Sequence, residues 1–264
     1  MKFGASTWLW TSPFDGSDVS LLQKIARLGF DFVEIPVEDP TRLDVARIGA
    51  ALKECGLEAI VCAAVVGERD LSSADPAKVE AAFSYFGACI DIANTWGSPF
   101  VVGPLYAPVA KPRLATEKER RDEWDRSVDN LRKLATLAQS KGVRIGIEPL
   151  NRFETDMVNR VEDAMRMIAA VDHPALGVSL DSFHMNIEEV DFRKAVELAG
   201  DRNSDWNGLK EGLKSAGYAG GISIESFSPD SSSLAEAVCI WRRFAPSQDE
   251  FARKGLEFLR NWYA

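Results

Sequence analysis

The feature that most constrains this chain is the regular alternation of short apolar runs with longer amphipathic stretches along its 264 residues. This alternation is typical of repeated β/α units, whose strands form a parallel sheet. Seven runs have the length and composition of strands. They are residues 3–8, 32–37, 59–66, 99–105, 144–150, 176–182 and 221–227. The pattern therefore predicts an α/β fold with a parallel sheet.

Several of the intervening helices have recognisable ends. The apolar series of residues 21–28 stops before Gly29, which is typical of a helix C-terminus. Asp75 and Pro76 fit the N-cap and the first position of a helix running to about residue 94. Further helices are predicted at residues 116–140, 160–171, 206–217 and 233–263. No linker-like or low-complexity segment interrupts the chain, so we expect a single domain over residues 1–264.

Composition excludes several classes of protein. The net charge of −9, with no long run of Lys or Arg, disfavours binding to nucleic acid. No apolar run reaches about eighteen residues, and the N-terminus lacks a signal-like segment, so we expect a cytoplasmic protein without membrane contact. The four cysteines, Cys55, Cys62, Cys89 and Cys239, show no CxxC spacing. We expect them to be small core residues.

Three carboxylates stand at the ends of predicted strands: Glu148, Asp181 and Glu225. In a β/α barrel the chemistry lies at these strand ends. Each residue alone could simply cap the following helix or pair with a surface Lys. Three converging carboxylates would repel one another, so they indicate a cation bound between them. Oxygen ligands favour Mn²⁺, Mg²⁺ or Co²⁺ over a structural zinc.

Four longer motifs carry a family resemblance. They are IEPLNRFETD from Ile147, SLDSFHMNIEE from Ser179, GYAGGISIESF from Gly217 and IWRRF from Ile240. They resemble the D-tagatose/D-allulose (psicose) 3-epimerases of the xylose isomerase-like TIM barrel superfamily. The resemblance implies a (β/α)₈ TIM barrel, a free ketose as substrate, and a homodimer or homotetramer.

The resemblance also implies roles for the three carboxylates. Glu148, Asp181 and Glu225 match metal ligands, and Glu148 and Glu225 match the catalytic pair. The implied cofactor is a divalent metal, with Mn²⁺ favoured over Co²⁺ and Mg²⁺. Two carboxylates on opposite faces of a sugar suit a 3-epimerase, because one can remove the C3 proton and the other can return a proton.

Other residues are candidates for binding the substrate. Glu154 and His184 match positions that hydrogen-bond a ketose near O1 to O3. Trp8 and Tyr106 lie at strand ends and are candidates for lining the same pocket. The simpler alternatives are a salt bridge from Glu154 to a nearby arginine, and a structural imidazole at His184 packed by its neighbours.

One departure from the family pattern concerns the seventh barrel strand, which is expected to end in a metal-binding His followed by a substrate-binding Arg. Here only residues 201–205, including Arg202 and Asp205, separate two predicted helices. Five residues span at most about 17–18 Å and leave no strand. His173 and His184 are the only histidines, and neither matches the absent ligand. Either this sequence omits a segment of strand-plus-loop size, or the protein carries a genuine deletion.

Alternative functions stay open. Another sugar isomerase or dehydratase of the superfamily, such as hydroxypyruvate isomerase or inosose dehydratase, would use a similar site. A catalytically defective sugar-binding relative would fit the missing ligand. An abasic-site endonuclease is disfavoured by two histidines and the acidic charge. The absence of a glycine-rich phosphate loop disfavours sugar phosphates.

Overall fold

The structure, a computed structural model, describes residues 1–63, 65–110, 115–199, 210, 213–214, 217–228 and 243–263. The chain divides into two compact units. The first comprises Met1–Cys62, Thr95–Ser98 and Ala219–Ala264, and the second comprises Ala63–Asn94 and Pro99–Tyr218. A search of the described residues finds no helix long and apolar enough to cross a membrane.

The first unit contains a parallel sheet centred on β1 (Lys2–Ser6). β1 lies between β2 (Phe32–Val37) and β7 (Gly221–Ile224), and β3 (Glu58–Ala63) follows next to β2. Ala5 pairs with Val33 on one side and with Ile224 on the other. Nearly all of β1 and β2 is buried, as expected for strands covered on both faces.

Two glycines in this sheet make room for one aromatic ring. A Cβ on Gly221 would lie 2.6 Å from the ring of Phe32, and a Cβ on Gly4 would overlap the same ring. Glycine inside a strand commonly marks such a close approach. The ring of Phe32 can therefore lie against β1 and β7 only because both strands lack a side chain at that point.

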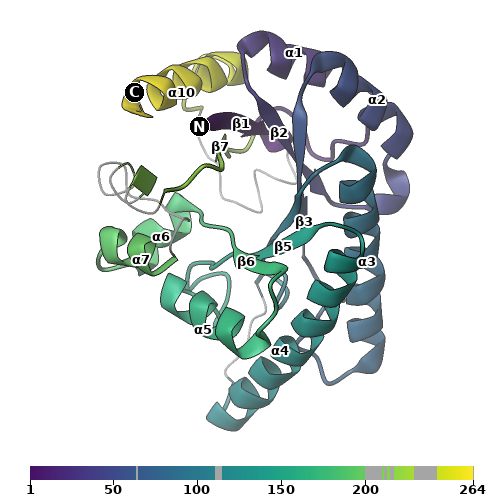
Figure 1. Cartoon of the computed structure of the whole chain (residues 1–264), viewed down its shortest axis with the longest axis vertical. Helices are drawn as coiled ribbons and strands as arrows, with labels where there is room; N and C mark the ends of the chain where they lie inside the picture. The colour runs from purple at the N-terminus through teal and green to yellow at the C-terminus, as the bar shows by residue number, and fades with distance from the viewer. Residues whose placement is uncertain are drawn as a thin grey trace. The chain divides into compact units, whose positions relative to one another are not determined.

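Among its described residues, the first unit has the α-helices α1 (Ser20–Leu28), α2 (Val45–Cys55) and α10 (Gln248–Tyr263). Figure 1 shows α1 and α2 side by side. Gly29 ends α1 with a φ of 95°, as predicted for a C-terminal glycine. α2 was not predicted from the sequence, although Asp44 caps it by accepting a hydrogen bond from the Arg47 N–H at 3.1 Å.

The start of α10 corrects one prediction. We expected a helix over residues 233–263, but residues 243–247 are not helical, and residues 233–242 lie outside the described residues. Pro246 lacks an N–H and disfavours a helical conformation for the residue before it. Ser247 then caps the new helix, because its Oγ accepts the Glu250 N–H at 3.1 Å.

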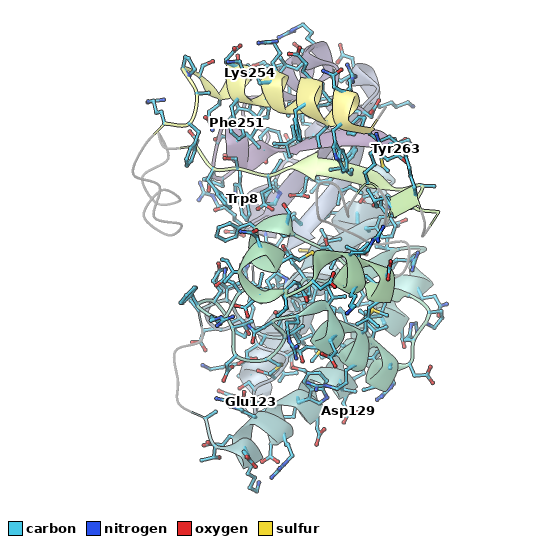
Figure 2. All side chains as sticks on the ribbon, turned by 90° about the vertical axis from the view of Figure 1, so that its left-hand side faces the viewer. Trp8, Glu123, Asp129, Phe251, Lys254 and Tyr263 are labelled. Carbon is cyan, nitrogen blue, oxygen red and sulfur yellow. The ribbon has the colours of Figure 1, made fainter. Side chains whose placement is uncertain are left out.

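Helix α10 is amphipathic. Phe251 and Tyr263 pack against the buried core that includes Phe3 and Ile25, whereas Lys254 is exposed. Figure 2 labels these three α10 side chains. The helix thus packs against β1 and β7, both of which it contacts.

The second unit contains β4 (Phe100–Gly103), β5 (Arg144–Ile147) and β6 (Leu176–Val178). β5 pairs in parallel with both neighbours, and Ile147 lies in register with Gly103 and with Val178. The residues that follow Ile147 and Val178 therefore emerge at the same edge of this sheet. Glu148 and Asp181 are among them.

The described part of the second unit contains five helices: α3 (Pro76–Trp96), α4 (Glu117–Ser140), α5 (Val161–Val171), α6 (Ser182–Glu188) and α7 (Phe192–Ala199). α4 and α5 lie side by side (Figure 1). The predicted caps are confirmed for α3, where Asp75 accepts the Ala77 N–H at 2.9 Å. Thr116 and Glu119 form a capping box on α4.

All seven predicted strands are present in the described residues. β2 has the predicted bounds, and the other six strands are shorter than predicted. We predicted that a segment is missing near Arg202 and Asp205, and these residues lie outside the described residues. Most of the helix predicted at 206–217 also lies outside them. Cys62 and Cys89 are buried as expected, and burial raises the pKa of the Cys89 thiol to about 12. Cys55 is half-buried, and Cys239 lies outside the described residues.

Candidate active site

Glu148 is positioned by the end of β5, which it directly follows. Its N–H donates to the Gly103 carbonyl at 3.0 Å, and its carbonyl accepts from the Tyr106 hydroxyl at 3.1 Å. The backbone is thus held on both sides, while the side chain is half-buried. A carboxylate on such a backbone keeps its direction without help from a flexible loop.

Asp181 does two things at once. It caps α6, since its Oδ1 accepts the Phe183 N–H at 2.7 Å. Its other oxygen, Oδ2, lies 3.7 Å from Nε2 of His184. The simple capping role considered for this residue is therefore real, but it occupies one oxygen and leaves the second directed at His184.

Glu148, Asp181 and His184 form one cluster. Each offers a ligand atom, and these atoms all lie within 4.8 Å of one another. His184 is buried, and the two carboxylates are half-buried. Two half-buried carboxylates at this distance repel each other, and a divalent cation would offset that repulsion. Carboxylate oxygens are suitable ligands for such a cation, so Glu148 and Asp181 fit a divalent metal.

Glu154 lies in the loop between β5 and α5, close to this cluster. Its Oε1 accepts from the side-chain amide of Asn151 at 2.8 Å and lies 4.0 Å from Nδ1 of His184. The arginines nearest to Glu154 in the sequence pair with other residues. Arg152 pairs with Glu188, and Arg160 pairs with acidic residues of α5. The structure thus brings together both residues predicted to contact the ketose near O1 to O3.

Asn151 was not predicted. It is 2% exposed and contacts both His184 and Glu154. The only feature of the sequence that could have indicated a role for Asn151 is its place in the motif that contains Glu148. A single asparagine in a loop belongs to no helical or strand periodicity that would mark it as buried.

The same loop is held to α6 by a clamp between Arg152 and Glu188. The guanidinium donates to both carboxylate oxygens of Glu188, at 2.8 and 2.9 Å, and the Arg152 N–H donates to Oε1 at 2.7 Å. The Glu188 side chain is only 6% exposed. Hydrogen bonding to Arg152 holds the pKa of the Glu188 carboxyl below its ordinary value of 4.5.

This clamp predicts a pH-dependent stability effect. Because the folded-state pKa of Glu188 is lowered, its contribution to stability is present above pH 4.5 and is lost as the pH falls through the folded-state pKa. We expect Glu188→Gln to lower the Tm by about 2–4 °C at pH 7 and by less at pH 3.5. Thermal melts at both pH values test this, with Glu162→Gln on the exposed face of α5 as control. An equal loss at both pH values would contradict the expectation.

Tyr106 is fully buried. Its hydroxyl donates to the carbonyls of Glu148 and Val158, at 3.1 and 3.2 Å, and burial raises its pKa well above the ordinary value of 10.0. The hydroxyl of Tyr106 thus supports the end of β5 that carries Glu148. Its predicted place in the lining of the substrate pocket stays a prediction.

Glu225 and Trp8 belong to the first unit. Glu225 follows β7 directly and is exposed. Trp8 follows β1, donates from its indole N–H to Glu38 at 3.0 Å, and contacts the ring of Phe227 with centroids 5.5 Å apart. Because β1 and β7 are parallel neighbours, both residues lie at the same edge of that sheet. Their roles stay predictions.

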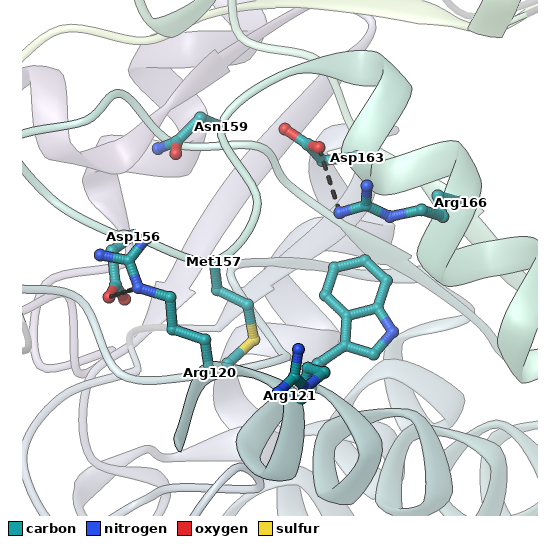
Figure 3. A pocket seen from close by; sticks show the side chains of 8 residues that line it. Arg120, Arg121, Asp156, Met157, Asn159, Asp163 and Arg166 are labelled. Carbon is teal, nitrogen blue, oxygen red and sulfur yellow. Dashed lines mark ion pairs between the residues drawn. The ribbon is translucent and has the colours of Figure 1, made fainter. Parts of the chain in front are cut away.

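A pocket of about 450 Å³ lies elsewhere in the second unit (Figure 3). Charged side chains from α4, α5 and the loop before α5 line it, among them Arg120, Asp156 and Arg166. Arg166 lies over the ring of Trp124, 4.5 Å from its centroid, and pairs with Asp163 at 3.3 Å. None of the predicted site residues lines this pocket, so it is not the candidate active site.

Known proteins resemble the chain over its whole length. The sequence pattern of the xylose isomerase-like TIM barrel family matches residues 22–203. L-ribulose 3-epimerase of Methylomonas sp. (strain DH-1) is 29% identical, with 100% of this chain and 98% of the relative covered. Ketose 3-epimerase of Arthrobacter globiformis is 29% identical, with 99% of this chain and 96% of that relative covered.

A solved structure of a 3-epimerase is also similar to this chain. The crystal structure of D-allulose 3-epimerase from Methylomonas sp., in complex with D-allulose, matches with a TM-score of 0.91 at 29% identity, covering 100% of this chain and 97% of that one.

The alignment with the Methylomonas relative extends over 283 residues, whereas this chain has 264. That relative therefore has residues without a counterpart here, as a missing strand and loop would produce. The TIM-barrel fold predicted from the sequence is confirmed, and the chain belongs to the xylose isomerase-like TIM barrel family, in its group of ketose 3-epimerases.

Proposed function

We propose that this protein is a metal-dependent ketose 3-epimerase that inverts C3 of a free ketohexose. The observation that carries the proposal is the convergence of Glu148 and Asp181 from neighbouring parallel strands, with His184 beside them. The relatives that match the whole chain support it, because their names describe 3-epimerases.

Glu148, Asp181 and Glu225 would hold the cation, for which Mn²⁺ is our first choice and Co²⁺ or Mg²⁺ the alternatives. The bound cation would supply Lewis-acid polarisation of the ketose carbonyl. The described cluster supports the assignment of Glu148 and Asp181. Glu225 is assigned from its motif alone.

The chain's own residues would move the protons. One carboxylate of the pair Glu148 and Glu225 takes the C3 proton, and the electrons of the broken C–H bond move to the C2 carbonyl oxygen, which gives a cis-enediolate. The other residue returns a proton to the opposite face of C3. The sugar gains and loses one proton, so its composition is unchanged and only the configuration differs. Such positioned acid–base catalysis contributes about 10²–10⁴-fold to a rate.

Glu154 and His184 would orient the ketose, since both lie beside the carboxylate cluster. Trp8 would line the remainder of the substrate site. We also propose that residues 1–264 act as one domain and assemble as a homodimer or homotetramer, which light scattering of the purified protein tests.

The test of the proposed function is product analysis with purified protein, Mn²⁺ and a panel of ketohexoses that includes D-fructose, D-tagatose and D-allulose. We expect products that differ from their substrates only at C3. Aldose products or dehydration would instead favour another isomerase or a dehydratase of the superfamily. Binding without turnover would favour a catalytically defective relative.

A further inference from the structure

The ring of His184 meets two hydrogen-bond donors of Asn151 at the same nitrogen. The backbone N–H of Asn151 points at Nδ1 from 3.2 Å, and the side-chain nitrogen Nδ2 lies 2.9 Å from Nδ1. The direction of the amide is set independently, because its Oδ1 accepts the N–H of Phe153 at 2.9 Å. The amide nitrogen therefore faces the imidazole.

These contacts determine which nitrogen of His184 carries the proton. Both groups of Asn151 that reach Nδ1 are N–H donors, and the side-chain amide is the nearer of the two, so Nδ1 offers its lone pair to them. The ring proton of a neutral imidazole is then on Nε2. Nε2 faces the carboxylate cluster, 3.7 Å from Oδ2 of Asp181.

We infer that the side-chain amide of Asn151 is a positioning group that keeps His184 in the Nε2–H form. His184 then presents an N–H donor to the carboxylate cluster and not a lone pair. In this form it binds a substrate oxygen and is not a replacement for the absent fourth metal ligand. The same amide donates to Oε1 of Glu154 at 2.8 Å, so it orients both predicted substrate contacts together.

The catalytic consequence rests on the proposed function. A donor directed at a ketose oxygen stabilises the negative charge that develops there when the C3 proton leaves. Residues that orient such groups commonly change activity by about 10–100-fold when replaced.

Nitrogen-15 NMR of the imidazoles tests the inference without substrate or metal. Protonated and unprotonated ring nitrogens have different shifts, and the chain has only two histidines. His173→Gln assigns the remaining signals to His184. We expect His184 to show a protonated Nε2 and an unprotonated Nδ1 in the wild-type protein. A protonated Nδ1 would overturn the inference, and this measurement does not depend on any variant of Asn151.

Asn151→Asp is the decisive substitution, because it puts an acceptor in place of the donor at nearly unchanged volume. We expect a protonated Nδ1 in this variant, because a charge-assisted hydrogen bond from Nδ1–H to the carboxylate is about twice as strong as the neutral one that the backbone N–H of residue 151 donates from 3.2 Å. We also expect a decrease in kcat of about 10–100-fold for the C3 epimerisation. An unchanged Nε2–H form would overturn the inference.

Asn159→Asp is the matched control. Asn159 belongs to the same loop and donates to the carbonyls of Leu150 and Thr155 at 2.9 and 3.0 Å. We expect this variant to keep the Nε2–H form of His184. A shift of the proton in Asn159→Asp as well would attribute the effect to general disturbance of the loop and would overturn the role of Asn151. If the wild-type protein has the expected protonation but epimerises no ketose, the proposed function fails and the positioning role stands.

Discussion

Replacing Glu148 by glutamine is expected to lower the rate of ketose epimerisation by at least about 10³-fold. The substitution removes the group proposed to exchange the C3 proton and one of the two carboxylates that converge in the described cluster. The fold is expected to persist, since the backbone of Glu148 makes the hydrogen bonds to Gly103 and Tyr106, and the variant keeps that backbone. Initial rates on the best ketose of the panel measure the effect.

Glu162→Gln serves as the control for Glu148→Gln. Glu162 lies on α5, its side chain is 67% exposed, and it pairs with Arg160. We expect this variant to have the wild-type rate. If Glu148→Gln were to retain more than about a tenth of the wild-type rate, Glu148 could not be the residue that exchanges the proton.

Removing the metal is the second change with a large expected effect. After dialysis against a chelator, we expect the epimerase activity to disappear and to return when Mn²⁺ is added. A cation at about 100 times its Kd stabilises the folded state by about 2.7 kcal/mol. For a chain of this size, that corresponds to a Tm increase of about 5–10 °C. Differential scanning fluorimetry with and without Mn²⁺ measures the shift.

Asp181→Asn distinguishes specific metal binding from general effects of the ion. Asparagine can still cap α6 through Oδ1, which accepts the Phe183 N–H, but it lacks the negative charge that would bind a cation. We expect this variant to lose most of the Mn²⁺-dependent shift while it keeps a Tm near that of the metal-free wild type. The account is wrong about the site if Mn²⁺ raises the Tm of the variant as much as that of the wild type.

The site residues that stand at the ends of strands could be predicted from the sequence. Glu148 and Asp181 interrupt or close apolar runs, and the ends of parallel strands lie at one edge of a sheet. The strands themselves were predictable for the same reason, because strands buried on both faces are short and uniformly apolar.

Contacts made by irregular segments were not predictable. Asn151 and His184 are 33 positions apart, and their contact depends on how the loop after β5 folds back. The spacing of the residues does not indicate this conformation of the loop. The long helix predicted at residues 233–263 was also wrong over residues 243–247, since the apolar periodicity of the sequence concealed the effect of Pro246.

The most direct test of the account is epimerisation in D₂O, followed by NMR of the product. If carboxylates at the barrel mouth remove the C3 proton and return one from solvent-exchanged groups, D-allulose formed from D-fructose with Mn²⁺ will carry deuterium at C3 and hydrogen at its other carbon positions. Allulose that retains its original C3 hydrogen, or a complete lack of allulose with the metal-loaded protein, would contradict the account.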